Sequence, residues 1–269
     1  MKISRLLFLC ALLPFTVLAN LSRDEAAALC HEATNQFTQG NDLAAKDHAA
    51  AADLWRKAAA RLERVTDEGG ISSGPLFYNL GNIYFRIGDV GRAILSYRRA
   101  QLYMPNDRNL RANLEFARRA RQDNVQTQES TRVLKTLFFW HYDFSLRLRE
   151  GLFLGFACAF FLLGTIRVFW RRNWLCWVMG VAICLAVLFG ASLGISEWSL
   201  SRHRPGVILD SEVVARKGDS DSYDRAFEDP LHAGTEFTLD ESRGAWLNIR
   251  LADGQQAWIP AASAGLVKY

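Results

Sequence analysis

The chain has 269 residues, of which 50% are hydrophobic, and a formal net charge of +4. A net charge this small, with basic residues gathered around apolar segments, argues against a nucleic-acid-binding surface and is typical of membrane-flanking sequence. The length allows roughly two modest domains. Cys30 is the one cysteine outside the leader and the apolar segments, so no disulfide framework is expected in the polar parts.

The first 19 residues have the features of a signal peptide. Lys2 and Arg5 precede an apolar run that Pro14 ends, and small residues at Val17 and Ala19 suit signal peptidase. We therefore expect cleavage after Ala19. Cleaved or retained, such a signal sends the segment that follows it across the membrane.

A helical repeat is predicted between residues 74 and 105. The small Gly81 and Ala93 would let two antiparallel helices approach closely, and Gly88 would open the turn between them. We expect helices from Pro75 to Ile87 and from Val90 to Tyr103. The spacing resembles the tetratricopeptide repeat at eight positions: Phe77, Leu80, Gly81, Tyr84, Ala93, Tyr97, Ala100 and Pro105.

Weaker copies flank this repeat and extend the predicted tetratricopeptide domain over residues 20–124. Residues 24–66 are expected to form a helix pair that turns at Gly40-Asn41, with an insertion of about six residues near the stretch LAAKDHAA. Its second helix repeats the small and aromatic residues of the central copy, as Ala51, Trp55 and Ala58. After Pro105 we expect one capping helix with an Arg-rich exposed face, whose buried side carries Leu110, Leu114 and Ala117.

A groove for a partner protein is predicted on the concave side, because the first helix of each pair faces that side in such repeats. Asparagine amides can hydrogen-bond the main chain of an extended peptide, and an arginine can bind a carboxylate. The alternative is that Asn79 and Asn82 only satisfy a neighbouring helix. The residues expected to line the groove are Tyr78, Asn79, Asn82, Phe85, Arg86, Asn113 and Arg119.

Two long apolar segments predict a transmembrane hairpin, at residues 150–170 and 174–197. Each is long enough to cross about 30 Å of hydrocarbon as a helix, and tryptophans stand at the segment ends. The aromatic stretch before them, residues 130–149, is expected to be an interfacial helix in which His141 is a polar surface residue.

Arginines flank both ends of the hairpin, so charge alone does not orient it. The signal peptide followed by two spans places residues 20–150 and 199–269 in one compartment. We expect a bacterial inner (cytoplasmic) membrane protein, with the repeat domain and the C-terminal domain on the periplasmic, extracytoplasmic side.

Short alternating strands replace the helices over residues 206–269. Asp253-Gly254, between WLNIRL and QAWIP, is a strong hairpin signal, and five short strands predict a small all-β barrel. The stretches VARKGDSDSYDRAFEDPLHAGTEFTL and GAWLNIRLADGQQAWIPAA resemble the bacterial Src-homology-3-type domain, a binding module that in some proteins takes cell-wall peptides. We expect Tyr223 and Trp258 to be its aromatic contacts. The alternative for Trp258 is that it is buried in the core, and for Trp246 a core position is the preferred prediction.

Motifs of catalysis and metal binding are not found. The sequence has no HExxH, no CxxC and no phosphate-binding glycine loop. The acidic stretch GDSDSYD places Asp224 where an EF-hand needs glycine. We therefore expect no enzyme, no metal site and no cofactor.

The order of the parts predicts a multi-domain chain: an all-α tetratricopeptide-type repeat, a transmembrane helical hairpin and a small all-β Src-homology-3-like barrel. With the stretches NLGNIYFRIGDVGRAILSYRRAQLYMPND, RANLEFARR and LFFWH, this order resembles the BatE family of aerotolerance operons. The resemblance implies a membrane complex with von Willebrand type A domain proteins and a MoxR-type ATPase, and a role in tolerating oxygen or envelope stress.

The expected function is therefore that of a non-enzymatic membrane scaffold or adaptor, whose extracytoplasmic groove docks a protein partner. The alternative is a cell-wall (peptidoglycan) recognition protein that binds through its C-terminal barrel.

Overall fold

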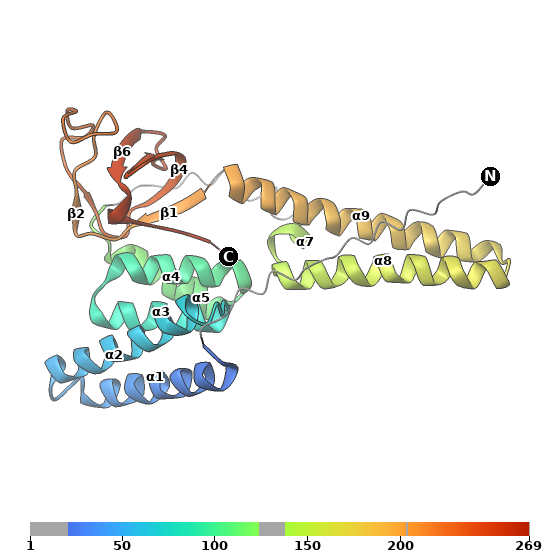
Figure 1. Cartoon of the computed structure of the whole chain (residues 1–269), viewed down its shortest axis with the longest axis horizontal. Helices are drawn as coiled ribbons and strands as arrows, with labels where there is room; N and C mark the ends of the chain where they lie inside the picture. Colours follow the sequence, from blue (N-terminus) through green and yellow to red (C-terminus); the bar gives the residue numbers. More distant parts are fainter. Residues whose placement is uncertain (1–20, 124–137, 203, 269) are drawn as a thin grey trace, which may run out of the picture.

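The computed structural model describes residues 21–123, 138–202 and 204–268. These residues form a bundle of helices, a long helical hairpin and a small antiparallel sheet (Figure 1). The bundle and the sheet lie together at one end of the hairpin, and the turn of the hairpin is at the opposite end. The predicted signal peptide, residues 1–19, lies outside the described residues.

The bundle consists of helices that pack on their neighbours along the chain: α1 (Arg23–Leu43), α2 (His48–Asp67), α3 (Gly74–Ile87), α4 (Val90–Tyr103) and α5 (Arg108–Ala120). The bounds of the central pair agree with the predicted ones to within one residue. Gly88 ends α3 with a φ of +91°, which a residue with a Cβ rarely adopts. Each helix begins after a side chain that accepts a backbone N–H, namely Ser22, Asp47, Ser73, Asp89 and Asp107.

Each helix pair packs a glycine of its first helix against an aromatic ring of its second. A Cβ added at Gly81 would lie 2.5 Å from the Tyr97 ring, and one added at Gly40 would lie 2.5 Å from Trp55. Gly40 is thus inside α1, and the predicted turn at Gly40-Asn41 is wrong. Within α1–α2 the chain turns at residues 44–47 instead.

The predicted insertion near LAAKDHAA is also wrong. Gly40 and Trp55 are about as far apart in sequence as Gly81 and Tyr97, so no insertion of six residues separates the glycine of the first helix from the ring of the second. The additional residues lie at the start of the first helix, because α1 has 21 residues and α3 has 14.

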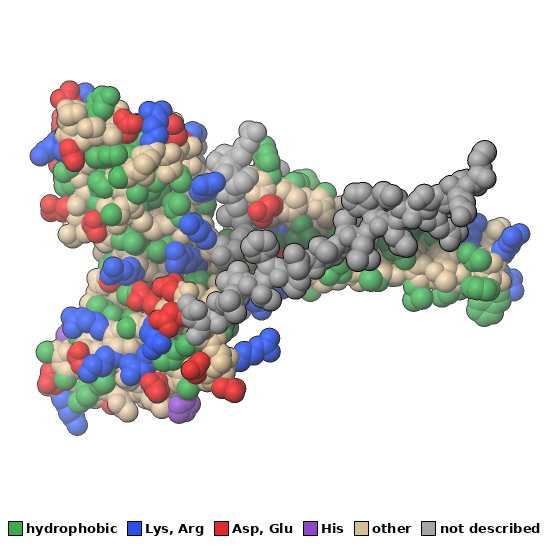
Figure 2. Space-filling view, viewed as in Figure 1, with side chains coloured by type: hydrophobic (Ala, Val, Ile, Leu, Met, Phe, Trp, Pro, Cys, Tyr) green, Lys and Arg blue, Asp and Glu red, His purple; other side chains and the backbone are tan. Residues whose placement is uncertain are grey.

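The hairpin consists of α8 (Leu146–Phe169) and α9 (Asn173–Arg202), joined by residues 170–172. Both helices are long and apolar enough to cross a membrane. Large apolar side chains are exposed along both helices and at the turn between them, such as Phe161, Phe169, Trp170 and Trp177. Figure 2 shows Lys and Arg side chains gathered at the far tip of the hairpin, where the chain carries Arg167, Arg171 and Arg172.

The predicted interfacial helix, residues 130–149, is not one continuous helix in its described part. A short helix, α7 (Phe139–Tyr142), ends before α8, and Ser145 caps α8 through its side chain. Residues 130–137 lie outside the described residues. His141 lies against the hairpin, with its Nδ1 2.9 Å from Ser192 Oγ. Arg149, only 5% exposed, donates to Ser192 Oγ at 3.0 Å and therefore ties α8 to α9 at the base of the hairpin.

The C-terminal part is a five-stranded antiparallel sheet in the order β6-β5-β4-β1-β7, with a separate pair β2-β3. Ile208, Ile249 and Ile259 are fully buried at its centre. The predicted hairpin at Asp253-Gly254 is confirmed, and Gly254 has a φ of +90°. The strands are β1 (Arg204–Ile208), β2 (Glu212–Val213), β3 (Leu231–His232), β4 (Glu236–Arg243), β5 (Trp246–Arg250), β6 (Gln256–Pro260) and β7 (Ala264–Leu266), with a 3-10 turn at Ala261–Ser263.

The sheet packs on α4, and a few of its apolar side chains extend the core of the bundle. Val207 of β1 and Val267 are buried in the same cluster as the side chains of the bundle. An added Cβ at Gly91 of α4 would lie 2.7 Å from the carbonyl oxygen of Ile208, so only a glycine permits this approach.

A carboxylate of the sheet also meets three arginines of the bundle. Glu236 Oε1 lies 2.7 Å from Arg118 Nε, and the same carboxylate lies 3.2 Å from Arg98 and 3.5 Å from Arg121. Burial alone would raise the pKa of Glu236, but the hydrogen bonds from Arg118 and the three positive charges outweigh it and lower that pKa. The Arg-rich face of α5, expected to be exposed, is therefore partly an interface with the sheet.

Asp123, just after α5, forms a second polar contact with the sheet. It accepts hydrogen bonds from the backbone N–H of His232 at 2.8 Å and from Thr235 Oγ1 at 2.5 Å, and it lies 2.7 Å from His232 Nδ1. Burial would raise the pKa of Asp123, but these hydrogen bonds lower it below its ordinary value. The bundle and the sheet are thus joined by apolar packing and by two anchored carboxylates.

Candidate functional site

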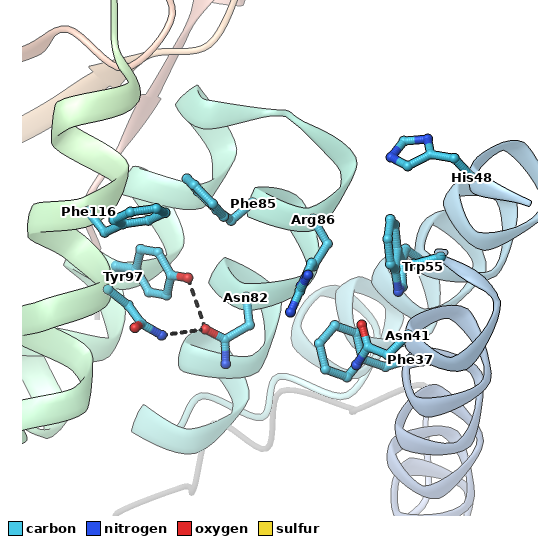
Figure 3. Close-up of a pocket in the computed structure, with 11 residues that line it drawn as sticks. Phe37, Asn41, His48, Trp55, Asn82, Phe85, Arg86, Tyr97 and Phe116 are labelled. Carbon is cyan, nitrogen blue, oxygen red and sulfur yellow. Dashed lines mark hydrogen bonds between the residues drawn. The ribbon is translucent and has the colours of Figure 1, made fainter. Parts of the chain in front are cut away.

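A hollow of about 650 Å³ is formed by the bundle alone. Figure 3 shows α1 and α2 on one side of it and α5 on the other, with side chains of α3 between them. Its lining is aromatic and polar: Phe37, Asn41, Ala44, His48, Trp55, Asn82, Phe85, Arg86, Tyr97, Asn113 and Phe116.

Four of the predicted groove residues line this hollow: Asn82, Phe85, Arg86 and Asn113. Asn79 lines a smaller neighbouring hollow of about 80 Å³, which shares Phe37 and Asn82 with the main one. Tyr78 lines neither of these two hollows, and its hydroxyl accepts a hydrogen bond from Asn113. Arg119 is exposed on α5 and lines neither of these two hollows, so the structure does not bring it together with the other predicted groove residues.

Most of the lining residues that sequence reasoning missed come from α1 and α2. Their register was lost because the turn of that pair was placed at Gly40. Taking Gly40 as the counterpart of Gly81 sets Asn41 in the position of Asn82, and Phe37 one turn before it. In the sequence, a glycine followed about 15 residues later by an aromatic residue, as in Gly40 and Trp55, was the signal that could have identified these lining residues.

Asn82 joins three helices through its side-chain oxygen. Its Oδ1 accepts from the Tyr97 hydroxyl at 2.9 Å and from Asn113 Nδ2 at 2.9 Å, as the dashed lines in Figure 3 mark. Asn113 Nδ2 also donates to the Tyr78 hydroxyl at 3.0 Å. Burial raises the pKa of Tyr97, so its hydroxyl stays protonated and remains a donor at neutral pH. The alternative, that Asn82 only satisfies a neighbouring helix, therefore describes its oxygen, whereas its Nδ2 makes no hydrogen bond among the described residues.

Arg86 supplies the positive charge of the hollow. Its side chain is exposed and forms no ion pair or hydrogen bond within the described residues. No Asp or Glu is among the described residues that line the hollow, and His48 stands at its edge on α2. The arrangement offers a cation and side-chain amides, which can donate and accept hydrogen bonds, to whatever enters.

Aromatic rings form the walls on either side of these polar groups. Phe85 and Phe116 are in contact, with ring centroids 5.3 Å apart, and Phe116 is 62% exposed. On the opposite side Phe37 and Trp55 close the hollow (Figure 3). The walls can therefore bury an apolar group, and the polar groups can orient it.

The two predicted contacts of the sheet differ in their surroundings. Tyr223 is 49% exposed in the loop between β2 and β3, where its ring packs over Gly218. Trp258 is only 8% exposed, and the guanidinium of Arg243 covers it with its carbon 5.0 Å from the ring centroid. Trp258 is therefore a core residue and cannot serve as a surface contact in this conformation.

The expectation that the sequence holds no catalytic motif needs one correction, because the stretch GASLG, residues 190–194, has the spacing of a hydrolase nucleophile motif. Its Ser192 lies within the continuous helix α9 and is 2% exposed, although His141 and Arg149 are in hydrogen-bond reach. A nucleophile of this type needs a turn between a strand and a helix to expose its hydroxyl. We therefore assign these contacts to the packing of the hairpin.

Among the described residues, no group of three or more His, Cys, Asp or Glu side chains could hold a metal ion. Comparison with family models, with curated proteins and with solved structures found no match.

Proposed function

We propose that this protein is a non-enzymatic, membrane-anchored adaptor that docks an extended segment of a partner protein in the hollow of its helical bundle. The observation that carries the proposal is the hollow itself, about 650 Å³ in size, where Arg86 stands among aromatic walls and has no ion-pair partner among the described residues. Its volume lies within the range of about 300 to 1,000 Å³ that is typical of ligand sites.

The hairpin α8–α9 is the proposed membrane anchor. Each helix suffices to span the hydrocarbon layer, and the exposed apolar side chains would otherwise face water. The bundle and the sheet lie at the same end of the hairpin, which supports a single compartment for both (Figure 1). We propose the periplasmic side, and active alkaline phosphatase fused to the C-terminus would support it. A fusion that is active only as a cytoplasmic reporter would contradict it.

We assign the bundle to the tetratricopeptide type, and the helix pairs, each packed through a glycine and an aromatic ring, support this assignment. We likewise assign the small antiparallel sheet to a Src-homology-3-like barrel. Membership of the BatE family is proposed on the sequence resemblance. It would supply von Willebrand type A domain proteins and a MoxR-type ATPase system as partners at the bacterial inner membrane, in a role against oxygen or envelope stress.

Photocrosslinking in intact membranes tests the docking. A p-benzoylphenylalanine at Phe116, which is exposed at the rim of the hollow, should form an adduct with a specific protein. The same probe at Ile71, which is 37% exposed and outside the hollow, is the control. Adducts that form equally at both positions, or none at Phe116, would contradict the proposal.

Cell-wall recognition through the sheet is the second candidate function, and the exposure of Tyr223 favours it. Insoluble peptidoglycan should then retain the purified full chain, and the Tyr223→Ala variant should be retained less. Equal retention of the two proteins would remove Tyr223 from this role.

A further inference from the structure

The polar side chains that face the hollow are the cation Arg86, His48 and the amides of Asn41, Asn82 and Asn113, and an amide can both donate and accept hydrogen bonds. The oxygen of Asn82 already accepts two hydrogen bonds, from Tyr97 and Asn113, so the free part of its amide is the Nδ2 donor. Figure 3 shows the Asn82 nitrogen turned away from both partners. Arg86, one turn along α3 from Asn82, adds a guanidinium that has five N–H donors and cannot accept.

The surroundings contain nothing that neutralises this charge. No carboxylate lies among the described residues that line the hollow, and Arg86 has no ion-pair partner within the described residues. A ligand with a carboxylate would form a charge-assisted pair with Arg86, whereas a cationic ligand would be repelled. Charge complementarity therefore favours an anionic ligand.

The shape and the walls specify more than a small anion. A second, smaller hollow adjoins the first and shares Phe37 and Asn82 with it, so that the two hollows lie next to each other between α1 and α3. The Phe85–Phe116 pair provides an apolar surface next to Arg86. An extended peptide with a large apolar side chain beside an acidic one matches both features.

We propose that the hollow selects an extended protein segment in which an Asp or Glu side chain stands close to a large apolar residue. Arg86 binds the carboxylate, Asn82 Nδ2 donates to a carbonyl or carboxylate oxygen of the segment, and the Phe85–Phe116 pair packs on the apolar side chain. This inference rests on the proposed docking function and names the chemistry of the docked segment.

Fluorescence anisotropy with a defined peptide library tests the inference. The library consists of labelled synthetic dodecamers with a central Phe, in which the neighbouring positions carry Asp, Asn or Lys and all other positions are Ala, Ser or Gly. The protein is the purified full chain in lipid nanodiscs. Asp peptides should bind about tenfold more tightly than their Asn counterparts, as expected for one charge-assisted pair at a partly exposed site.

Charge reversal at Arg86 gives the matched test. Arg86→Gln should remove the preference for Asp over Asn, and Arg86→Glu should invert it in favour of the Lys peptides. Arg119→Glu changes an exposed arginine of α5 outside the hollow and should leave the preference intact. Unchanged circular dichroism of the variants would establish that they are folded.

Several outcomes would overturn the inference. These are equal binding of Asp, Asn and Lys peptides, binding of none of them, or an acidic preference that survives Arg86→Gln. Self-association of the purified chain that Arg86→Glu abolishes would identify a second copy as the occupant. Specific crosslinking at Phe116 without an acidic preference would retain the docking function and reject only the chemistry proposed here.

Discussion

Replacing Glu236 with Gln tests how firmly the sheet is fixed to the helical bundle. The Glu236 side chain is 21% exposed and pairs with three arginines, so the substitution leaves those cations together without their carboxylate. Removing one partner of a fully buried pair costs about 3–5 kcal/mol. Because part of Glu236 still reaches solvent, we expect about 2–3 kcal/mol in the free energy of opening this interface, between the buried and the exposed cases.

Hydrogen exchange at His232 measures that opening directly. Its backbone N–H donates to Asp123 Oδ2 across the interface, so it exchanges only when the sheet separates from the bundle. A loss of 2–3 kcal/mol corresponds to exchange that is roughly 30- to 150-fold faster in the Glu236→Gln protein, measured on the full chain in nanodiscs.

The control is Asp240→Asn, within the same strand. Asp240 is also 21% exposed, but its partner, Arg250, is 49% exposed and belongs to the same sheet. This substitution should cost no more than about 1 kcal/mol and should leave exchange at His232 nearly unchanged. If Glu236→Gln changes that exchange less than threefold, or if both variants change it equally, the argument for a charge-anchored interface is refuted.

Three further predictions concern the fold and its pH dependence. Gly81→Ala should destabilise the bundle by about 1–3 kcal/mol, because the added Cβ would meet the Tyr97 ring. Thermal unfolding followed by circular dichroism measures this loss, and an unchanged midpoint of unfolding would contradict the close packing of Gly81 on Tyr97. The pKa values of Glu236 and Asp123 are lowered on folding, so the stability they give is present above about pH 4.5 and is lost as the pH falls through their folded pKa values. The protection factor at the interface, which is the intrinsic exchange rate divided by the observed rate at the same pH, should therefore fall only in acid. A protection factor that stays constant down to about pH 3 would contradict this. Gly254→Ala should cost about 1–2 kcal/mol, because the residue has a φ of +90°, and an unchanged chemical denaturation curve would contradict that strain.

Local signals in the sequence predicted the central helix pair and the hairpin of the sheet. Gly88 and Pro105 bracket the second helix of that pair, and each acts on the backbone where it stands. The Asp253-Gly254 dipeptide similarly determines its own turn. Such features depend on a few adjacent residues, so no knowledge of the remaining chain was needed.

The docking of the sheet could not be predicted in this way. Arg118 and Glu236 are 118 residues apart, and nothing in either stretch indicates the other. An Arg-rich helix face normally suggests exposure to solvent, because isolated charges are costly to bury. Here the carboxylate of Glu236, on a strand distant in sequence, offsets the cost of burying Arg118. This pairing is visible only in the tertiary structure.

The candidate site was predicted on α3 and at Asn113 of α5, and its residues on α1 and α2 were missed, for a related reason. A groove formed by several helices depends on the register of each one, and a single misplaced turn shifts every residue of a helix to another face. The Gly81–Tyr97 contact set the register of the central pair correctly. In the first pair, reading Gly40 as a turn residue concealed the same contact.

Helix α4 connects the two parts that function is proposed to use. On one side of α4, Ile94 lies against Gly234 of the sheet part. On the other side, the ring of Tyr97 packs on Gly81, and its hydroxyl donates a hydrogen bond to the side-chain oxygen of Asn82. Tyr97 can fix that amide only if α4 keeps its position, and the sheet limits the movement of α4 from behind. The position of the Asn82 donor in the hollow therefore depends on a contact made by residues more than a hundred positions further along the chain.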